Sequence, residues 1–152
     1  MNMNKQTTII TVQGTPAPQG SKRHIGGGRM IEANKNLPAW RAAVTKAAQQ
    51  AHQTDPYDGP VHVTVDFFLA KPKKPRWQVP ATGYDLDKLQ RAIGDALEKA
   101  KVITNDARIT RWEAQKWYPV EGKPTGAIIT VTPAMPLHPD TMADQPPHDG
   151  AA

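Results

Sequence analysis

The sequence contains no cysteine among its 152 residues. This absence excludes a disulfide scaffold, a zinc–thiolate site and a thiol nucleophile. No apolar run approaches the roughly 18 residues of a membrane-spanning helix, and the first residues lack the apolar stretch of a signal peptide. We therefore expect a cytoplasmic protein with no membrane partner. A Gly-x-Ser-x-Gly elbow and a P-loop are also missing, and the histidines show no metal-ligand spacing.

Proline, by contrast, is plentiful. Its 15 residues are about twice the usual share of roughly 5%. Residues 133–152 contain five prolines and three aspartates but no lysine or arginine. Such a segment buries too little apolar surface to offset its ordering entropy. We therefore predict one domain over residues 1–132 and a disordered, Pro-rich acidic tail over residues 133–152.

Positive charge dominates the rest of the chain. The formal net charge is +5, and without the three acids of the tail it becomes +8 for residues 1–132. A basic body attracts polyanions, and nucleic acid is the first candidate, although many basic proteins have no such partner. Two clusters of cations are predicted to bind DNA: Lys22, Arg23 and Arg29 in a Gly-rich stretch, and Lys71, Lys73, Lys74 and Arg76 before Trp77. The second of these clusters also fits a solvated linker stiffened by proline.

Hydrophobic periodicity predicts four strands and two helices. Runs that are β-branched or alternate between apolar and polar residues predict strands over residues 7–12, 61–69, 109–118 and 127–132. Apolar residues at helical spacing predict one helix between a cap at Asn36 and Ala51, and another over residues 86–100. Residues 14–34 and 71–84 are predicted as loops. The order β-α-β-α-β-β indicates an α/β (α+β) domain with two helices packed on one mixed sheet.

Asp85 and Asp87 lie where the second basic loop enters the second predicted helix. They flank Leu86, which belongs to the buried stripe, so both carboxylates should face away from the core. The dipole at a helix N-terminus favours their ionised form. Paired carboxylates in a basic protein suit Mg²⁺, which binds one or two carboxylates together with substrate phosphate. A third acid, Asp106, precedes the strand 109–118, and whether it reaches the pair depends on helix packing.

Simpler structural roles could explain the same residues. Asp85 alone suits a helix N-cap. Arg91 lies four residues after Asp87 and four before Asp95, which permits a surface ladder worth a few tenths of a kcal/mol per pair. Arg91 could instead neutralise a phosphate. An EF-hand is disfavoured because leucine and glutamine occupy the fifth and sixth positions, and an aspartyl-phosphate enzyme because no apolar strand precedes the acids.

Residues 85–97 read DLDKLQRAIGDAL, and residues 104–109 read TNDARI. These two segments resemble the RusA family of Holliday junction resolvases. The family pattern is Asp-x-Asp-Asn-Leu-x-Lys-Ala-x-x-Asp-Ala-Leu, followed by Asp-Asp-x-x-Val/Ile before a strand. Residues 14–23 look like the opening loop of phage-type members. The resemblance covers roughly residues 7–132.

The resemblance implies a RusA-like fold and a small homodimeric endonuclease. Such an enzyme depends on Mg²⁺, for which Mn²⁺ can substitute, and resolves four-way DNA by paired nicks during recombination and repair in a bacterial or phage-infected cell. Asp85, Asp87 and Asp106 match the metal-binding catalytic acids. Arg91 replaces the catalytic lysine and Lys88 an asparagine, while an asparagine replaces the first acid of the Asp-Asp pair. Because arginine cannot act as a general acid, we assign Arg91 to the phosphate or the acids and Lys88 to DNA binding.

Two other functions remain open from the sequence. A non-catalytic protein that binds branched DNA would need the basic loops, with the acids serving only as cap and ladder. A nuclease that cuts flaps or other branched DNA would need the same acids and the same loops as a junction resolvase.

Overall fold

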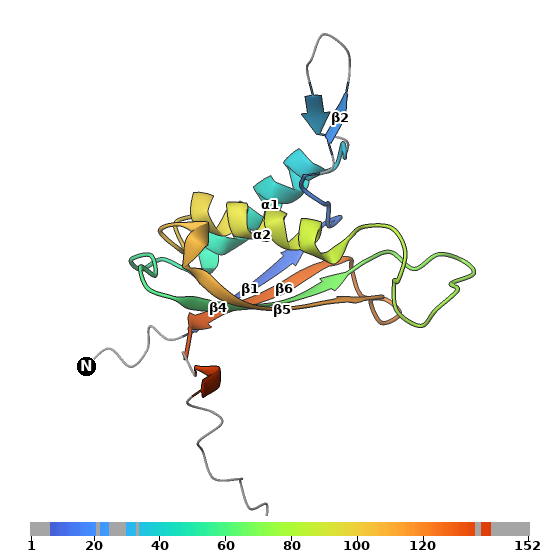
Figure 1. The fold of residues 1–152 in the computed structure, drawn as a ribbon. Helices are drawn as coiled ribbons and strands as arrows, with labels where there is room; N and C mark the ends of the chain where they lie inside the picture. The colour runs from blue at the N-terminus through green and yellow to red at the C-terminus, as the bar shows by residue number, and fades with distance from the viewer. Residues whose placement is uncertain (1–6, 21, 25–29, 33, 136–137, 141–152) are drawn as a thin grey trace, which may run out of the picture.

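Two helices cover one face of a four-stranded mixed sheet (Figure 1). The structure, a computed structural model, describes residues 7–20, 22–24, 30–32, 34–135 and 138–140. The strands lie in the order β1 (Thr8–Gln13), β6 (Gly126–Pro133), β4 (Val61–Phe68) and β5 (Ile109–Trp117). The helices are α1 (Leu37–Ala51) and α2 (Leu86–Lys99). The predicted α+β class, with two helices on a mixed sheet, is confirmed.

The connection between β4 and β5 determines where the acids lie. β6 pairs antiparallel with β1 and with β4, whereas β4 and β5 are parallel. Parallel neighbours need a long crossover, which is usually a helix, and here α2 supplies it. The chain leaves β4 through a long loop, returns along α2 and enters β5 through a 3₁₀ turn, η1 (Asp106–Arg108). Consequently α2 packs against β5 and η1.

The core lies between the helices and the sheet. Every second residue of β4 is buried, as its alternating sequence predicts. The buried stripes of the helices recur every three or four residues. The largest fully buried side chains include Trp40, Leu37, Phe67, Leu89, Ile93, Leu97 and Ile129. Within the described residues, no helix is long and apolar enough to cross a membrane.

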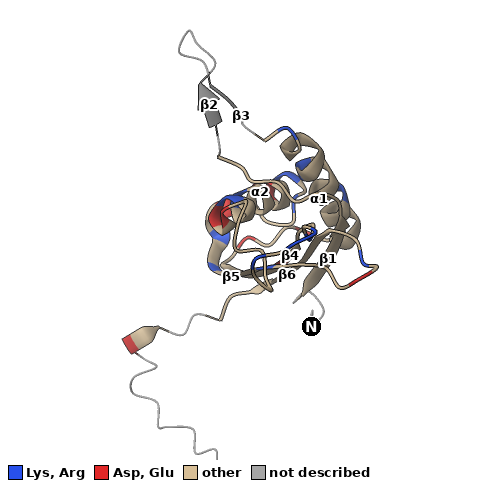
Figure 2. Ribbon diagram, turned by 90° about the vertical axis from the view of Figure 1, so that its right-hand side faces the viewer, with Lys and Arg blue, Asp and Glu red and all other residues tan. Residues whose placement is uncertain are grey.

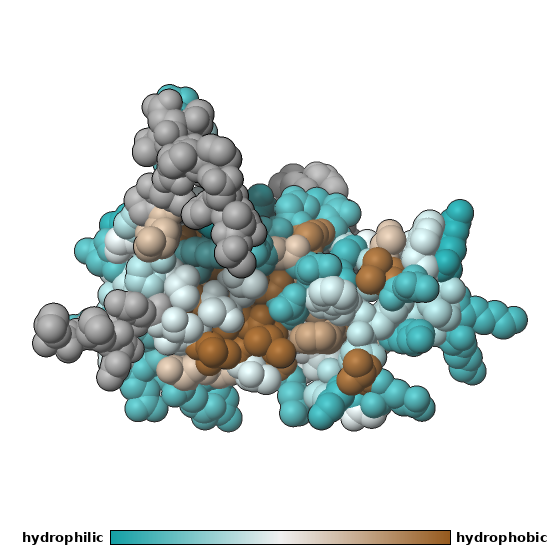
Figure 3. All heavy atoms as spheres, turned by 90° about the horizontal axis from the view of Figure 1, so that it is seen from below, coloured by the Kyte–Doolittle hydropathy of each residue, from teal (hydrophilic) through white to brown (hydrophobic). Residues whose placement is uncertain are grey.

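The opposite face of the sheet carries apolar side chains that remain exposed. Ile9 in β1 is 61% exposed and Ile128 in β6 is 39% exposed. Viewed from this side, hydrophobic residues gather near the centre of the sheet (Figure 3). The helices cover the other face, so in the part of the chain that the structure describes no helix shields these residues.

The prediction of an unbroken loop over residues 14–34 is wrong. Two short strands, β2 (Lys22–His24) and β3 (Met30–Glu32), pair antiparallel within it. Three-residue strands are too short to produce a recognisable hydrophobic alternation, which is why periodicity missed them. The three glycines between the strands in the sequence are typical of hairpin connections and were the available signal.

Most of the predicted acidic tail lies outside the described residues. Pro133 is the last residue of β6, one residue beyond the predicted domain boundary. Residues 136–137 and 141–152 lie outside the described residues. The division into a domain and a disordered tail therefore stays a prediction.

Candidate active site

Two of the three predicted acids line one pocket between α2 and the start of β5. The pocket has a volume of about 230 Å³. Asp87 lies two helical turns before Gly94, about 10 Å along the axis, whereas Asp106 lies beside Gly94. A Cβ built on Gly94 would be 3.9 Å from Asp106 Cβ. The residues that line the pocket are Asp87, Gln90, Arg91, Gly94, Asp106, Ile109 and Trp112.

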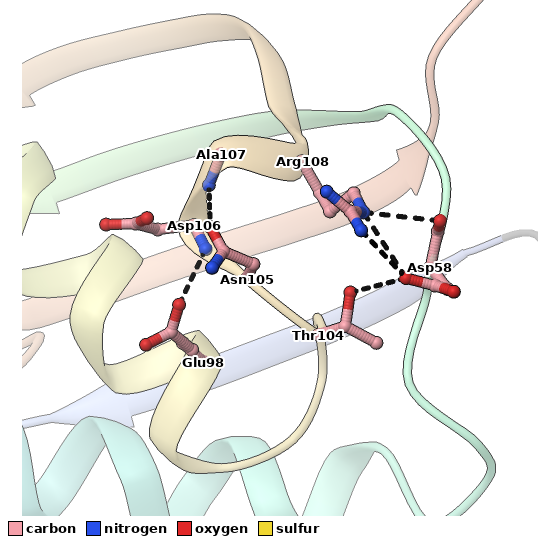
Figure 4. Close-up of polar contacts among 7 residues, drawn as sticks. All are labelled: Asp58, Glu98, Thr104, Asn105, Asp106, Ala107 and Arg108. Atoms are coloured by element: carbon pink, nitrogen blue, oxygen red, sulfur yellow. Dashed lines mark hydrogen bonds and ion pairs between the residues drawn. The ribbon is translucent and has the colours of Figure 1, made fainter.

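A small hydrogen-bond network holds Asp106 at the start of the η1 turn (Figure 4). The side chain of Asn105 accepts a hydrogen bond from the Ala107 amide at 2.8 Å and so caps the turn. Glu98, near the end of α2, accepts a hydrogen bond from the Asp106 amide at 2.8 Å. Both bonds use backbone amides. The Asp106 carboxylate itself has no hydrogen bond or ion pair with another described residue, so it is available to a ligand.

Asp58 holds the other end of the same turn. Its carboxylate accepts hydrogen bonds from the Thr104 hydroxyl at 2.7 Å and from the Arg108 guanidinium at 3.2 Å (Figure 4). The hydrogen bond from Thr104, then the hydrogen bond and the charge of Arg108, lower the pKa of Asp58 below its ordinary value of 3.8. The turn that carries Asp106 is thus attached to the loop before β4.

This attachment predicts a specific dependence of stability on pH. The pKa of Asp58 is lower in the folded than in the unfolded protein, so its contribution is complete above pH 3.8 and is lost as the pH falls through the folded pKa. We expect Asp58→Asn to lower the free energy of unfolding at neutral pH. The difference in this free energy between the variant and wild type should become smaller below pH 3.8. Urea unfolding between pH 2 and pH 7 measures this. Glu121→Gln, which neutralises an exposed acid without a described partner, is the control. The assignment would be contradicted if the difference in free energy of unfolding between this control and wild type decreased by the same amount below pH 3.8.

Arg91 lines the pocket, and its guanidinium lies close to Gly20. A Cβ added at Gly20 would lie 2.7 Å from Arg91 Nη1, and Gly20 has a φ of +101°, which favours glycine. The Arg91 side chain is exposed and forms no ion pair with a described residue. Its charge is therefore available to neutralise an anion in the pocket.

The surface ladder that the spacing permitted is not formed. The Gln19 side-chain amide donates a hydrogen bond to the Asp95 carboxylate and accepts one from Arg41 Nη1 at 3.2 Å. The Gln19 backbone amide also donates to the Lys88 carbonyl at 3.0 Å. These bonds attach the loop after β1 to both helices. Asp95 thus serves this attachment rather than Arg91, and no ion pair with a described residue links Arg91 to either neighbouring acid.

Asp85 is placed differently from the other two acids. It occupies the N-cap position of α2, but its side chain makes no capping hydrogen bond. Its carboxylate instead lies 3.3 Å from Lys88 Nζ, in an ion pair whose acid is 69% exposed. Asp85 does not line the pocket. Its predicted role as a metal ligand is therefore not tested by this arrangement and stays a prediction.

The donor set of the pocket suits a hard divalent cation. Asp87 and Asp106 contribute carboxylate oxygens, and neither carboxylate has a partner among the described residues. Mg²⁺ prefers such oxygens and keeps several waters, so two carboxylates and a substrate phosphate are sufficient. Within the described residues, no group of three or more acids and histidines is spaced to hold a metal ion by itself.

The comparison with protein families decides the assignment. The family model of endodeoxyribonuclease RusA matches residues 12–132. The chain belongs to the RusA endodeoxyribonuclease family. It is thus an enzyme that hydrolyses DNA phosphodiester bonds, and membership implies nuclease activity on Holliday junctions. A search of curated proteins finds no match.

The basic loop of this RusA-family nuclease is exposed beyond the end of the sheet (Figure 1). Lys71, Lys73, Lys74 and Arg76 form no ion pair with a described residue, so their charges are free for phosphates. The Arg76 guanidinium lies 4.4 Å from the centre of the Trp77 ring, and Trp77 is 44% exposed. Further cations lie on both helices (Figure 2). The predicted contacts at Lys22 and Arg23 lie in β2, of whose side chains nothing is described, and Arg29 lies outside the described residues.

Several residues of the candidate site could not be predicted from the sequence. Gln19 and Glu98 are polar residues without a motif, and only tertiary contact reveals their roles. Gly94 did carry a signal, because glycine inside a helix costs about 1 kcal/mol relative to alanine and needs a reason. A Cβ added at Gly94 would lie 3.7–3.9 Å from Ile109, Trp112 and Asp106, which is ordinary van der Waals contact, so packing by itself does not explain the glycine.

Proposed function

We propose that the chain is a Mg²⁺-dependent Holliday junction resolvase that works as a homodimer and cuts two strands of the junction symmetrically. The observation that carries this proposal is the pocket that Asp87, Arg91 and Asp106 line together. Neither carboxylate and no part of the guanidinium has a described partner. The carboxylates can hold a divalent cation and the guanidinium can neutralise a phosphate, which suits metal-assisted phosphodiester hydrolysis. We place the activity in residues 1–132, with residues 133–152 as a tail outside it.

In this proposal Asp87 and Asp106 hold Mg²⁺ or Mn²⁺, and Asp85 joins them by leaving its ion pair with Lys88. The bound metal would supply a water of lowered pKa and neutralise charge on the phosphate. Arg91 stays protonated at all working pH values, so it positions and neutralises the phosphate and transfers no proton. The guanidinium lies close to Gly20, where an added Cβ would be 2.7 Å from Arg91 Nη1.

The basic segments would bind the arms of the junction through phosphates. Four cations of the loop 71–77 form no ion pair with a described residue, and each phosphate contact would add to the salt dependence of binding. A four-way junction offers two equivalent strands, and a dimer with twofold symmetry offers two equivalent pockets. This match between the symmetry of the substrate and that of the dimer supports the homodimer.

The decisive experiment measures how the purified protein cuts several labelled DNA substrates. We expect cutting of a synthetic four-way junction, paired on opposite strands, in the presence of Mg²⁺ and none with EDTA. A linear duplex of the same sequence should stay intact. If a flap were cut as fast as the junction, the substrate would be branched DNA in general rather than four-way junctions. A protein that stays monomeric on the junction in analytical ultracentrifugation would contradict the dimer.

A further inference from the structure

A second pocket lies where the basic loop joins the body of the domain. Its volume is about 340 Å³. Four segments form its walls: the loop after β1, the chain after β4, the end of the basic loop before α2, and the chain after β5. The main lining residues are Pro16, Leu69, Pro72, Tyr84, Tyr118 and Thr125. It shares no lining residue with the pocket of Asp87 and Asp106.

Hydrogen bonds from backbone amides and from two side chains fix the walls of this pocket. The Gly14 amide donates to the Thr125 carbonyl at 3.1 Å, and the Thr125 hydroxyl donates to the Gly14 carbonyl at 2.7 Å. The Leu69 amide donates to the Trp117 carbonyl at 2.8 Å. Lys116 Nζ donates to the Tyr84 carbonyl at 2.9 Å and so holds the end of the basic loop against β5. The cavity is therefore preformed.

The chemistry of the lining fits a flat heteroaromatic ring. Tyr84 and Tyr118 are both half-buried, and neither phenol hydroxyl has a hydrogen-bond partner among the described residues. Leu69, Pro16 and Pro72 add apolar surface. Apolar walls with a few unpaired polar groups are typical of small-ligand sites, and tyrosine rings stack on nucleobases of any sequence.

Charge around the pocket indicates what such a ring is attached to. Pro72 in the lining lies between Lys71 and Lys73, which are exposed and form no ion pair with a described residue. On its other side, Tyr84 is followed directly by the start of α2, whose first turn carries Asp87. A ligand in the pocket would thus continue into a polyanion on the cationic loop and reach toward the acids.

We propose that this pocket receives one unstacked nucleobase from the strand that is cut, at the branch point of the DNA. This rests on the proposed function, because it needs DNA as substrate. Taking a base out of a duplex costs unpairing and unstacking energy, and the cost is lowest where the base is already unpaired or poorly stacked. The pocket therefore favours branched DNA over linear duplex.

A double-mutant cycle between protein and DNA tests the base–pocket contact. Junctions with a single abasic nucleotide at successive positions around the cut are digested under single-turnover conditions by wild type and by Tyr118→Ala. We expect one position at which the abasic site slows wild type about tenfold, the scale of losing one base–aromatic stack. Tyr118→Ala should slow cutting of the intact junction by a similar factor and show no further loss at that position.

The controls separate the pocket from the rest of the function. Val120→Ala alters the same loop at a residue outside this pocket and should cut like wild type. Tyr118→Phe keeps the ring and should retain most of the rate. If wild type cuts the junction but no abasic position within a few nucleotides of the cut matters, the pocket proposal is wrong and the resolvase stands, even if Tyr118→Ala fails to fold. If wild type cuts no branched DNA, the proposed function itself fails.

Discussion

Replacing Asp87 with asparagine should lower the rate of junction cutting about a thousandfold, the scale on which single electrostatic contacts act in active sites. The reason is the position of Asp87 in the pocket that it shares with Arg91 and Asp106. Asparagine keeps the shape but removes the charge that holds a divalent cation. Because the Asp87 side chain is exposed and has no described partner, the fold should lose only its interaction with the helix dipole, about 0.3–1 kcal/mol.

Two measurements make this prediction decisive. Single-turnover cutting reports the rate, and a mobility-shift assay in EDTA reports binding of the same junction. We expect binding to persist in Asp87→Asn, since the removed group is an acid and the phosphate contacts belong to the cations. Glu121→Gln removes one negative charge from an exposed loop and is the matched control. Unchanged cutting by Asp87→Asn would show that the pocket is not where the bond is hydrolysed.

The same assay applied to Asp85→Asn settles the role of the first acid. Asp85 lies outside the lining of the pocket and is paired with Lys88. If it becomes a metal ligand when DNA and metal bind, Asp85→Asn should lose activity as severely as Asp87→Asn. A rate near that of wild type would limit the metal ligands to Asp87 and Asp106.

Local patterns were enough to predict most of the fold. Alternation along β4 and the apolar stripe of α2 follow from burial on one face, so periodicity recovers both elements to within a residue or two. The same reasoning placed Asp85 and Asp87 on the outer side of the first turn of α2. It failed for β2 and β3, because three paired residues are too few to impose a period.

The site was harder to predict because distant contacts compete with local spacing. Asp95 stands at the right distance from Arg91 for a helical ion pair, yet Gln19, which is 76 residues away, takes its carboxylate. A side chain that a packed loop already orients loses less entropy on bonding than a long exposed pair does. The placement of Asp106 beside Gly94 likewise depends on how α2 packs on β5, which no spacing within either element encodes.

Gly126→Ala should destabilise the fold by about 3 kcal/mol or more, because it combines backbone strain with a steric clash. Gly126 begins β6 and pairs with Gln13 of β1 and Phe68 of β4. Its φ is +152°, and a Cβ there would lie 1.9 Å from the Val12 carbonyl oxygen. That oxygen belongs to the backbone of a paired strand, so only a shift of β1 against β6 can relieve the clash.

A second glycine of the same connection separates the strain from the clash. Gly122 also has a positive φ, +84°, but a Cβ there would meet no atom of a described residue within 4 Å, so Gly122→Ala should cost only about 1–2 kcal/mol. Urea unfolding of both variants measures the difference between their losses of stability, and equal losses would contradict the clash.

The displacement of β1 against β6 should also affect junction cutting. Two hydrogen bonds between Gly14 and Thr125 join the end of β1 to the start of β6. The loop after Gly14 runs to Gly20, where an added Cβ would lie 2.7 Å from Arg91 Nη1. Folded Gly126→Ala should therefore also cut junctions more slowly than folded Gly122→Ala, because the loop that passes close to Arg91 starts from a displaced strand.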